Sequence, residues 1–271
     1  MTAVDGNARW RQRCLTHATW LARALREGRY LSDVWRWPGF VFESITLDWM
    51  HMADLGTTMV ILGNVLFECF KELGGLVTQP ADGLARLVVF IADAAHQIGQ
   101  EAPFSKLTLG MLRGEDLKPR LKLKAAHVRH MVPITLRLLE DHFDTASEHA
   151  QARLNCVRCC WAAYQELYNW DEGSADRFEE AVIRMLHVYH QLARESIANN
   201  PRWLAWRWFP NMHMILHLAR QAHIVGNPRN WWCYMDEGSI GLAVDLSESV
   251  HPLHVLFCGD GKHLARRELD D

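Results

Sequence analysis

Residues 145–198 read TASEHAQARLNCVRCCWAAYQELYNWDEGSADRFEEAVIRMLHVYHQLARESIA and contain a long pair of helical patterns. The two patterns cover residues 145–170 and 174–198, and only Asp171, Glu172 and Gly173 separate them. A short connection between two long helices is typical of an antiparallel helical hairpin. The sequence therefore predicts a hairpin and a fold in which helices pack on helices.

Most of the remaining chain also has apolar residues at helical spacing. We predict helices over residues 8–27, 57–73, 81–100, 125–140 and 212–224, and a last helix that begins at residue 236 or 237 and ends near 250. Residues 40–47, FVFESITL, lack this spacing and are rich in aromatic and β-branched side chains, so they are the best strand candidate. The predicted fold class is mainly α, a helical bundle with at most one or a few short strands.

Composition excludes several classes of protein. The 271 residues are 49% hydrophobic and carry a net charge of −3, which is typical of a folded globular chain. The most apolar stretch, residues 57–70, is too short for a membrane span of about 20 residues. Seven cysteines and the absence of a secretory pattern favour an intracellular protein, nuclear or cytoplasmic, that is not secreted.

Charge alternates along the chain in blocks. Residues 1–40, 101–135 and 201–235 each carry a net charge of +4, whereas residues 41–100, 136–200 and 236–271 each carry −5. Three basic blocks on one face would let a nearly neutral protein hold a phosphate backbone. An ordinary mixed surface is the other interpretation.

One basic stretch has a pattern of its own. Lys118, Arg120, Lys122 and Lys124 alternate with uncharged residues. In an extended chain, alternate side chains point to the same face, so the pattern predicts four positive charges on one side.

Acidic residues occur where predicted elements begin or end. Asp48 follows the strand candidate, and Asp236 and Glu237 follow an aromatic segment at a predicted helix start. Carboxylates at such positions ligate hard cations, but they also cap helices, because a negative charge is favoured at a helix N-terminus. Both interpretations stay open for all three residues.

Two further patterns are possible metal sites. His213 and His217 share one helix face, yet Met214 stands where a zinc protease has its glutamate. A metal-dependent helical enzyme would use them with His51 and Asp54. Cys156 and Cys159 have C-x-x-C spacing, but no second pair exists to complete a structural zinc site, so we predict core packing for these cysteines.

Four short motifs together resemble the C-terminal half of an RNase H-like DDE transposase. They are DWMHxxDLG at 48–56, KLKAAHVRH at 122–130, HMILHL at 213–218 and NPRNWWCYMDE at 227–237. The resemblance implies that Asp48 is the second catalytic acid, that Glu237 or Asp236 is the last, and that Asp48 and Glu237 hold Mg²⁺ when the site is catalytic. It also implies a DNA partner, with phosphate contacts from the basic residues Lys118, Arg120, Lys122, Lys124, Arg129, Arg202, Arg207, Arg220 and Arg229.

The chain departs from the transposase pattern at its beginning. The first strands and the first catalytic Asp are missing, and two Mg²⁺ ions need three carboxylates. The expectation is one compact unit over 1–271: an N-terminal helix (1–38), a remnant of the RNase H-like core (39–75), a helical insertion (76–210) and C-terminal helices (211–271). The predicted function is an inactive, transposon-derived nucleic-acid-binding fragment without a cofactor. The alternative is an all-α protein-interaction domain with a Trp-rich partner surface and no membrane contact.

Overall fold

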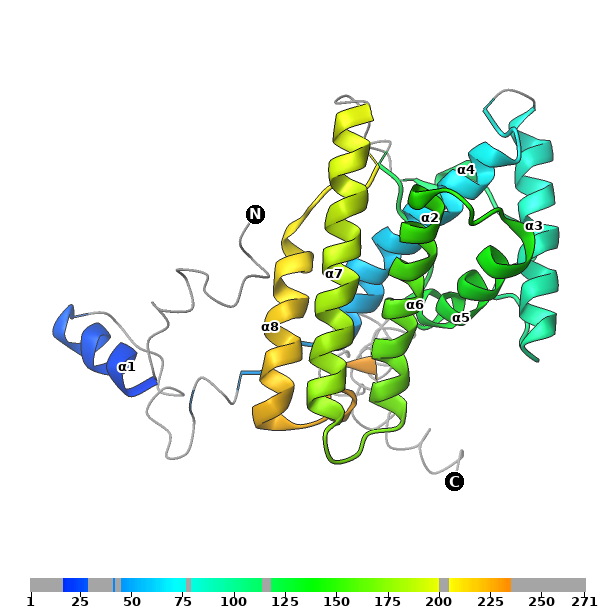
Figure 1. Ribbon diagram of the computed structural model, residues 1–271. Helices are drawn as coiled ribbons and strands as arrows, with labels where there is room; N and C mark the ends of the chain where they lie inside the picture. Colours follow the sequence, from blue (N-terminus) through cyan, green and yellow to red (C-terminus); the bar gives the residue numbers. More distant parts are fainter. Residues whose placement is uncertain are drawn as a thin grey trace, which may run out of the picture. The chain divides into compact units, whose positions relative to one another are not determined.

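Helices form the regular secondary structure of this protein. The computed structural model describes residues 17–28, 41, 45–76, 79–113, 118–199 and 205–234 (Figure 1). Within these ranges no strand is present, and the one isolated β-bridge joins Arg113 to Pro119. The predicted mainly-α fold class is confirmed. The elements are α1 (His17–Arg26), η4 (Met50–Thr57), α2 (Thr58–Glu72), α3 (Pro80–Gln97), α4 (Leu109–Leu112), α5 (Ala125–His142), α6 (Glu148–Tyr168), α7 (Ser174–Asn199), α8 (Pro210–Val225) and η5 (Pro228–Asn230).

The predicted hairpin is the pair α6 and α7, which lie side by side in Figure 1. Ser147 is the N-cap of α6: its Oγ accepts a hydrogen bond from the backbone N–H of Ala150 at 3.1 Å. Gly173 turns the chain between the helices with a φ of +91°, a conformation that favours glycine. α8 packs along α7, and α5 packs on α6 and α3.

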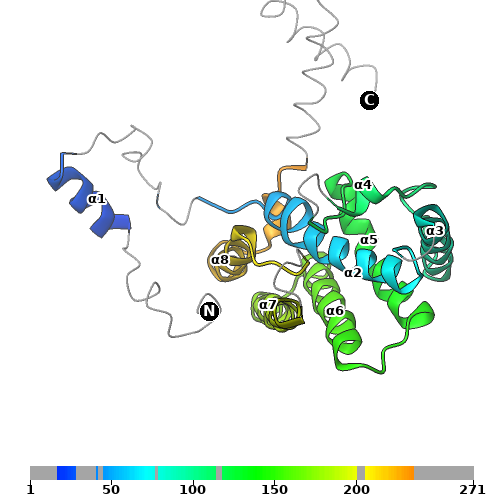
Figure 2. The ribbon, with the colours of Figure 1, turned by 90° about the horizontal axis from the view of Figure 1, so that it is seen from above.

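The apolar helix α2 lies between α8 on one side and α3 on the other (Figures 1 and 2). Its side chains Ile61, Leu62, Val65 and Leu66 are fully buried. Residues Met50–Glu72 are helical over a length, and with an apolar character, sufficient to span a membrane. However, 83% of an apolar 18-residue stretch within them is buried inside the protein, as in a core helix.

The strand prediction for residues 40–47 is wrong for the part of it that the structure describes. Val41 and Ile45–Leu47 belong to no strand. The side chain of Gln221 on α8 takes the place of a strand partner: its Oε1 accepts the N–H of Leu47 at 3.1 Å, and its amide donates to the carbonyl of Ile45 at 2.5 Å. Those backbone groups are therefore satisfied without a sheet.

Residue contacts divide the chain into two units, Met1–Asn230 and Trp231–Asp271. The described part of the second unit is residues 231–234. The predicted subdivision of the first 230 residues stays a prediction, and the site below belongs entirely to the first unit.

Candidate nucleic-acid interface

The stretch of residues 118–124, hereafter the basic segment, is extended between α4 and α5. Its four cationic side chains Lys118, Arg120, Lys122 and Lys124 are exposed. Pro119 and Leu121, which alternate with them, are buried. The alternation thus places the charges on the solvent side and the apolar side chains against the core.

Backbone hydrogen bonds hold the basic segment from two sides. The N–H groups of Arg120 and Lys122 donate to the carbonyls of Leu112 and Met111 at 2.9 and 2.8 Å. Between them, the N–H of Leu121 donates to the carbonyl of Met59 on α2 at 3.0 Å. Successive backbone N–H groups are hydrogen-bonded on opposite sides of the segment. The cationic side chains are therefore attached to a rigid backbone and not to a loose loop.

Gly63 lets the basic segment cross α2 at close range. A Cβ atom at this position would lie 2.3 Å from the Cα of Arg120 and 2.5 Å from its nitrogen. These contacts are with backbone, which cannot turn aside as a side chain does. A residue with any side chain at position 63 would push the basic segment away from α2.

Residues 205–209 form the opposite wall. Trp206 is 1% exposed and adopts a φ of +53°, a left-handed conformation that costs a bulky residue roughly 1–2 kcal/mol. Hydrogen bonds hold it there: its backbone N–H donates to Asn64 Oδ1 at 2.7 Å, and its indole N–H donates to Glu68 Oε1 at 2.6 Å. The hydroxyl of Tyr189 donates to the next carbonyl, that of Arg207, at 2.8 Å. Arg207 and Trp208 are consequently directed outward and exposed.

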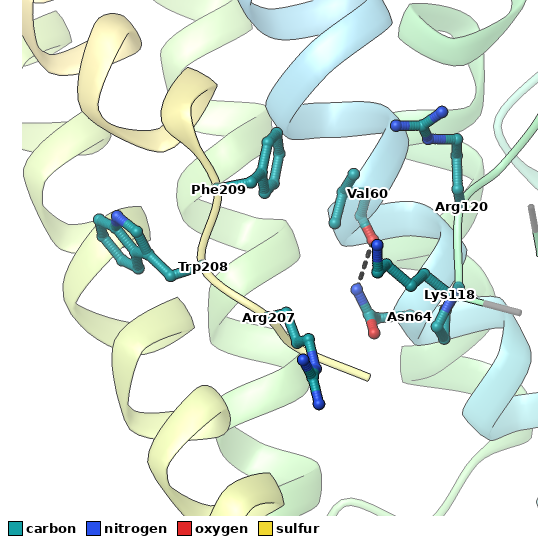
Figure 3. Close-up of a pocket in the computed structure, with 8 residues that line it drawn as sticks. Val60, Asn64, Lys118, Arg120, Arg207, Trp208 and Phe209 are labelled. Carbon is teal, nitrogen blue, oxygen red and sulfur yellow. Dashed lines mark hydrogen bonds between the residues drawn. The ribbon is translucent and has the colours of Figure 1, made fainter. Parts of the chain in front are cut away.

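The two walls enclose a pocket of about 310 Å³ over the start of α2 (Figure 3). Lys118 and Arg120 come from one wall and Arg207 from the other, while Trp208 is 38% exposed at the edge. A second pocket of about 580 Å³ shares Arg120 and is lined further along by Lys122, Lys124, His127, Met59 and Leu123. We call the two pockets together the basic groove. No acidic side chain lines it among the residues that the structure describes.

Behind the groove wall, His149 lies between two carboxylates. Its Nε2 is 3.0 Å from Glu68 and its Nδ1 is 3.0 Å from Glu195. The contact with Glu68, reinforced by Glu195, raises the pKa of His149 to about 9 although partial burial opposes the change. Burial acts to raise the pKa of Glu68, but hydrogen bonds from His149 and Trp206 outweigh it and the pKa is lowered. Glu68 is therefore a charged acceptor for the Trp206 indole at neutral pH.

The other predicted DNA-contacting arginines lie elsewhere. Arg229 stacks over Tyr168, with 5.0 Å between its Cζ and the ring centroid. Burial raises the pKa of the Tyr168 phenol, and the charges of Arg129 and Arg229 act against that rise. Arg220 donates to Glu179 at 3.0 Å, which compensates its charge. Arg202 lies outside the described residues.

The three predicted catalytic acids are only partly described. Asp48 caps the helix that follows it, because its Oδ2 accepts the backbone N–H of His51 at 2.8 Å and lies 2.7 Å from the Nδ1 of the same residue. Asp236 and Glu237 lie outside the described residues, as does the helix predicted from there to about 250. Convergence of Asp48 with Glu237 on Mg²⁺ stays a prediction.

The metal candidates Asp54 and His51 differ in burial. Asp54 is completely buried and accepts a hydrogen bond from the hydroxyl of Tyr164, whereas His51 is exposed. Cys156 and Cys160 are buried in α6, and burial raises the pKa of Cys160 to about 12, so its thiol stays protonated. Core packing is confirmed for Cys156, and the half-buried Cys159 also has a raised pKa through burial.

The described tryptophans of the predicted Trp-rich surface range from buried to exposed, so that surface stays a prediction. Trp49 and Trp206 are each 1% exposed, and Trp208 is the exposed member of its group. Sequence reasoning missed the supporting residues Gly63 and Asn64. A glycine inside an apolar helix was the available signal, because such a glycine is unfavourable unless another backbone approaches closely.

No protein-family model, curated protein or solved structure matches this chain.

Proposed function

We propose that this protein binds nucleic acid through phosphate contacts in the basic groove. The observation that carries the proposal is the meeting of cations from two distant parts of the chain, the basic segment and Arg207, in a groove that no described acidic residue lines. Two of the three basic blocks of the sequence, residues 101–135 and 201–235, thereby contribute to one positive site, although the net charge of the protein is −3.

The chemistry of the groove suits a polyphosphate. Each phosphate that a lysine or arginine neutralises releases condensed counterions, and this release drives affinity. Lys122 and Lys124 are exposed, and no ion pair or hydrogen bond to their side chains occurs among the described residues. The partly exposed indole of Trp208 offers a surface on which a base can stack. α5 begins directly after Lys124, so the positive end of its dipole adds to the field.

We further infer that the polymer is DNA and that the chain derives from a transposase. The four motifs that resemble DDE transposases support this inference, and the KLKAAHVRH motif contains Lys122 and Lys124 of the groove. The proposal concerns binding of nucleic acid and includes no claim about catalytic turnover.

Equilibrium binding of fluorescently labelled DNA tests the proposal. In the Lys122→Ala/Lys124→Ala variant we expect affinity at low salt to fall about tenfold, and the slope of log affinity against log salt to decrease by about 2. Arg184→Ala/Arg194→Ala removes the same charge from the exposed face of α7 and is the control. Equal losses in both variants would reduce the effect to net charge, and no binding by the unmodified protein would refute the proposal.

An apolar groove favours protein binding as a second candidate function. It has a volume of about 450 Å³ and is lined on α3 by Ala81, Leu84, Ala85 and Val88, on the following loop by Leu107, and at the start of α4 by Leu109. Spacing of three and four residues along one helix face is typical of a site for a partner helix. Such binding would be insensitive to salt and would be lost in Val88→Glu, which leaves the basic groove unchanged.

A further inference from the structure

His213 and His217 bring their ring nitrogens to one point. The two residues lie one turn apart on α8, with ring planes at 88° and centroids 4.5 Å apart. Their Nε2 atoms are 2.8 Å apart. Both residues are partly exposed.

The helix that carries the two rings is fixed in the fold. Met212, Ile215, Leu216 and Leu218 are buried on the other faces of α8, which packs on α7 and η4. Because both imidazoles belong to one turn of a packed helix, little conformational entropy is lost when a metal ion binds them.

The separation matches that of two nitrogen ligands of one metal ion. Metal–nitrogen bonds of about 2.0–2.1 Å that meet at a right angle place their nitrogens roughly 2.8–3.0 Å apart. Right angles between ligands occur in octahedral and square-planar coordination, which Ni²⁺ and Cu²⁺ adopt. Tetrahedral Zn²⁺ needs about 3.4 Å, which a small rotation of either ring supplies.

We propose that His213 and His217 bind a divalent transition-metal ion through their two Nε2 atoms. Imidazole prefers such ions to Mg²⁺ and Ca²⁺, which take oxygen ligands. The site therefore differs from the Mg²⁺ site that the transposase resemblance implies for Asp48 and Glu237. It is also independent of the basic groove.

A direct hydrogen bond between the rings is the competing explanation of the short distance. That bond requires one Nε2 to carry a hydrogen and the other to accept it. Metal binding requires both Nε2 atoms to be unprotonated, so it replaces the hydrogen bond and leaves the one hydrogen of each neutral ring on Nδ1. The two explanations consequently differ in whether added metal changes the protein.

Calorimetric titration with Ni²⁺ after treatment with a chelator tests the site. We expect His213→Asn and His217→Asn each to weaken Ni²⁺ binding by about tenfold or more. His96→Asn, which changes an exposed histidine of α3, is expected to retain the affinity of the unmodified protein. Mg²⁺ at the same concentration should give no heat of binding at this site. Equal Ni²⁺ affinity in all four proteins, or no Ni²⁺ binding at all, would overturn the proposal.

A second measurement does not depend on the variants. In the unmodified protein, paramagnetic Ni²⁺ should broaden the NMR signals of α8 residues around positions 213–217 before those of α3 and α6. Broadening centred on another element would contradict the assignment even if the histidine variants failed to fold.

Discussion

Asn64 connects one wall of the basic groove, residues 205–209, to helix α2. It is 1% exposed, donates to the carbonyl of Val60 at 2.8 Å and accepts the N–H of Trp206 at 2.7 Å. The left-handed backbone at Trp206 is retained because this acceptor is in place. Together with Glu68 and Tyr189, this buried amide fixes the direction in which Arg207 and Trp208 leave the core.

Asn64→Ala leaves the buried N–H of Trp206 without its acceptor. We expect the free energy of unfolding to fall by about 1–3 kcal/mol, and affinity for DNA to fall as the wall carrying Arg207 relaxes. Urea unfolding followed by DNA binding under conditions in which the variant is folded measures both effects. A stability loss with unchanged DNA affinity would separate Asn64 from the groove.

His149 makes stability depend on pH. Its pKa in the folded protein, about 9, lies above the value of about 6.5 expected in the unfolded chain. Its stabilising contribution is therefore complete below about pH 6.5 and is lost as the pH rises through about 9. Because the side chain is 41% exposed, solvent screening limits the effect to about 1 kcal/mol.

His149→Gln should remove this part of the pH dependence. Thermal unfolding is measured from about pH 6 to about pH 9.5, a range that includes both pKa values. The stability of the unmodified protein is expected to decline over this range, and that of the variant is not. Parallel profiles for the two proteins would show that Glu68 and Glu195 do not hold the imidazolium.

Asp48 illustrates what a single position in a sequence cannot specify. Its place before a helix is compatible with both a metal ligand and a cap. The structure shows the capping hydrogen bond, and the metal role stays a prediction. Both roles use the same carboxylate at the same position, so only the surrounding atoms distinguish them.

The basic groove requires that the basic segment cross α2 at close range. Gly63→Ala places a methyl group against the backbone of Arg120. In most exposed helical positions this substitution stabilises a protein by up to about 1 kcal/mol; here we expect a loss of about 1–3 kcal/mol from overpacking, together with weaker DNA binding.

Gly110→Ala is the matched control, since the nearest atom to its new Cβ is the Thr108 Oγ1 at 3.9 Å. Chemical denaturation of both variants measures the difference. If Gly63→Ala is as stable as Gly110→Ala and binds DNA equally well, the close crossing has no role in forming the groove.

Helix periodicity predicted most of the described elements. The hairpin helices, expected over 145–170 and 174–198, are Glu148–Tyr168 and Ser174–Asn199, and the helix expected over 57–73 is Thr58–Glu72. The strand expectation failed because β-branched composition records only a local preference. Instead, the side chain of Gln221, 174 residues away from Leu47 in the sequence, accepts the backbone hydrogen bond of Leu47.

Across the protein, the alternation of charged blocks indicated that basic blocks could lie on one face. It did not indicate which blocks do so or where that face is. Lys118–Lys124 alternation was visible in the sequence, and its exposure follows from an extended backbone. The opposing wall was not predictable in the same way. Arg207 reaches the groove through the turn at Trp206, and that turn depends on hydrogen bonds to Asn64 and Glu68, more than 130 residues earlier in the chain.

Photo-crosslinking to 4-thiothymidine-substituted DNA tests the proposed interface most directly. After proteolysis, mass spectrometry identifies the peptides that carry nucleotide. Binding in the basic groove predicts adducts within residues 118–127 and 205–209, which decrease as salt is raised. Adducts confined to the apolar groove on α3 or to the α6–α7 hairpin, or none at low salt, would contradict it.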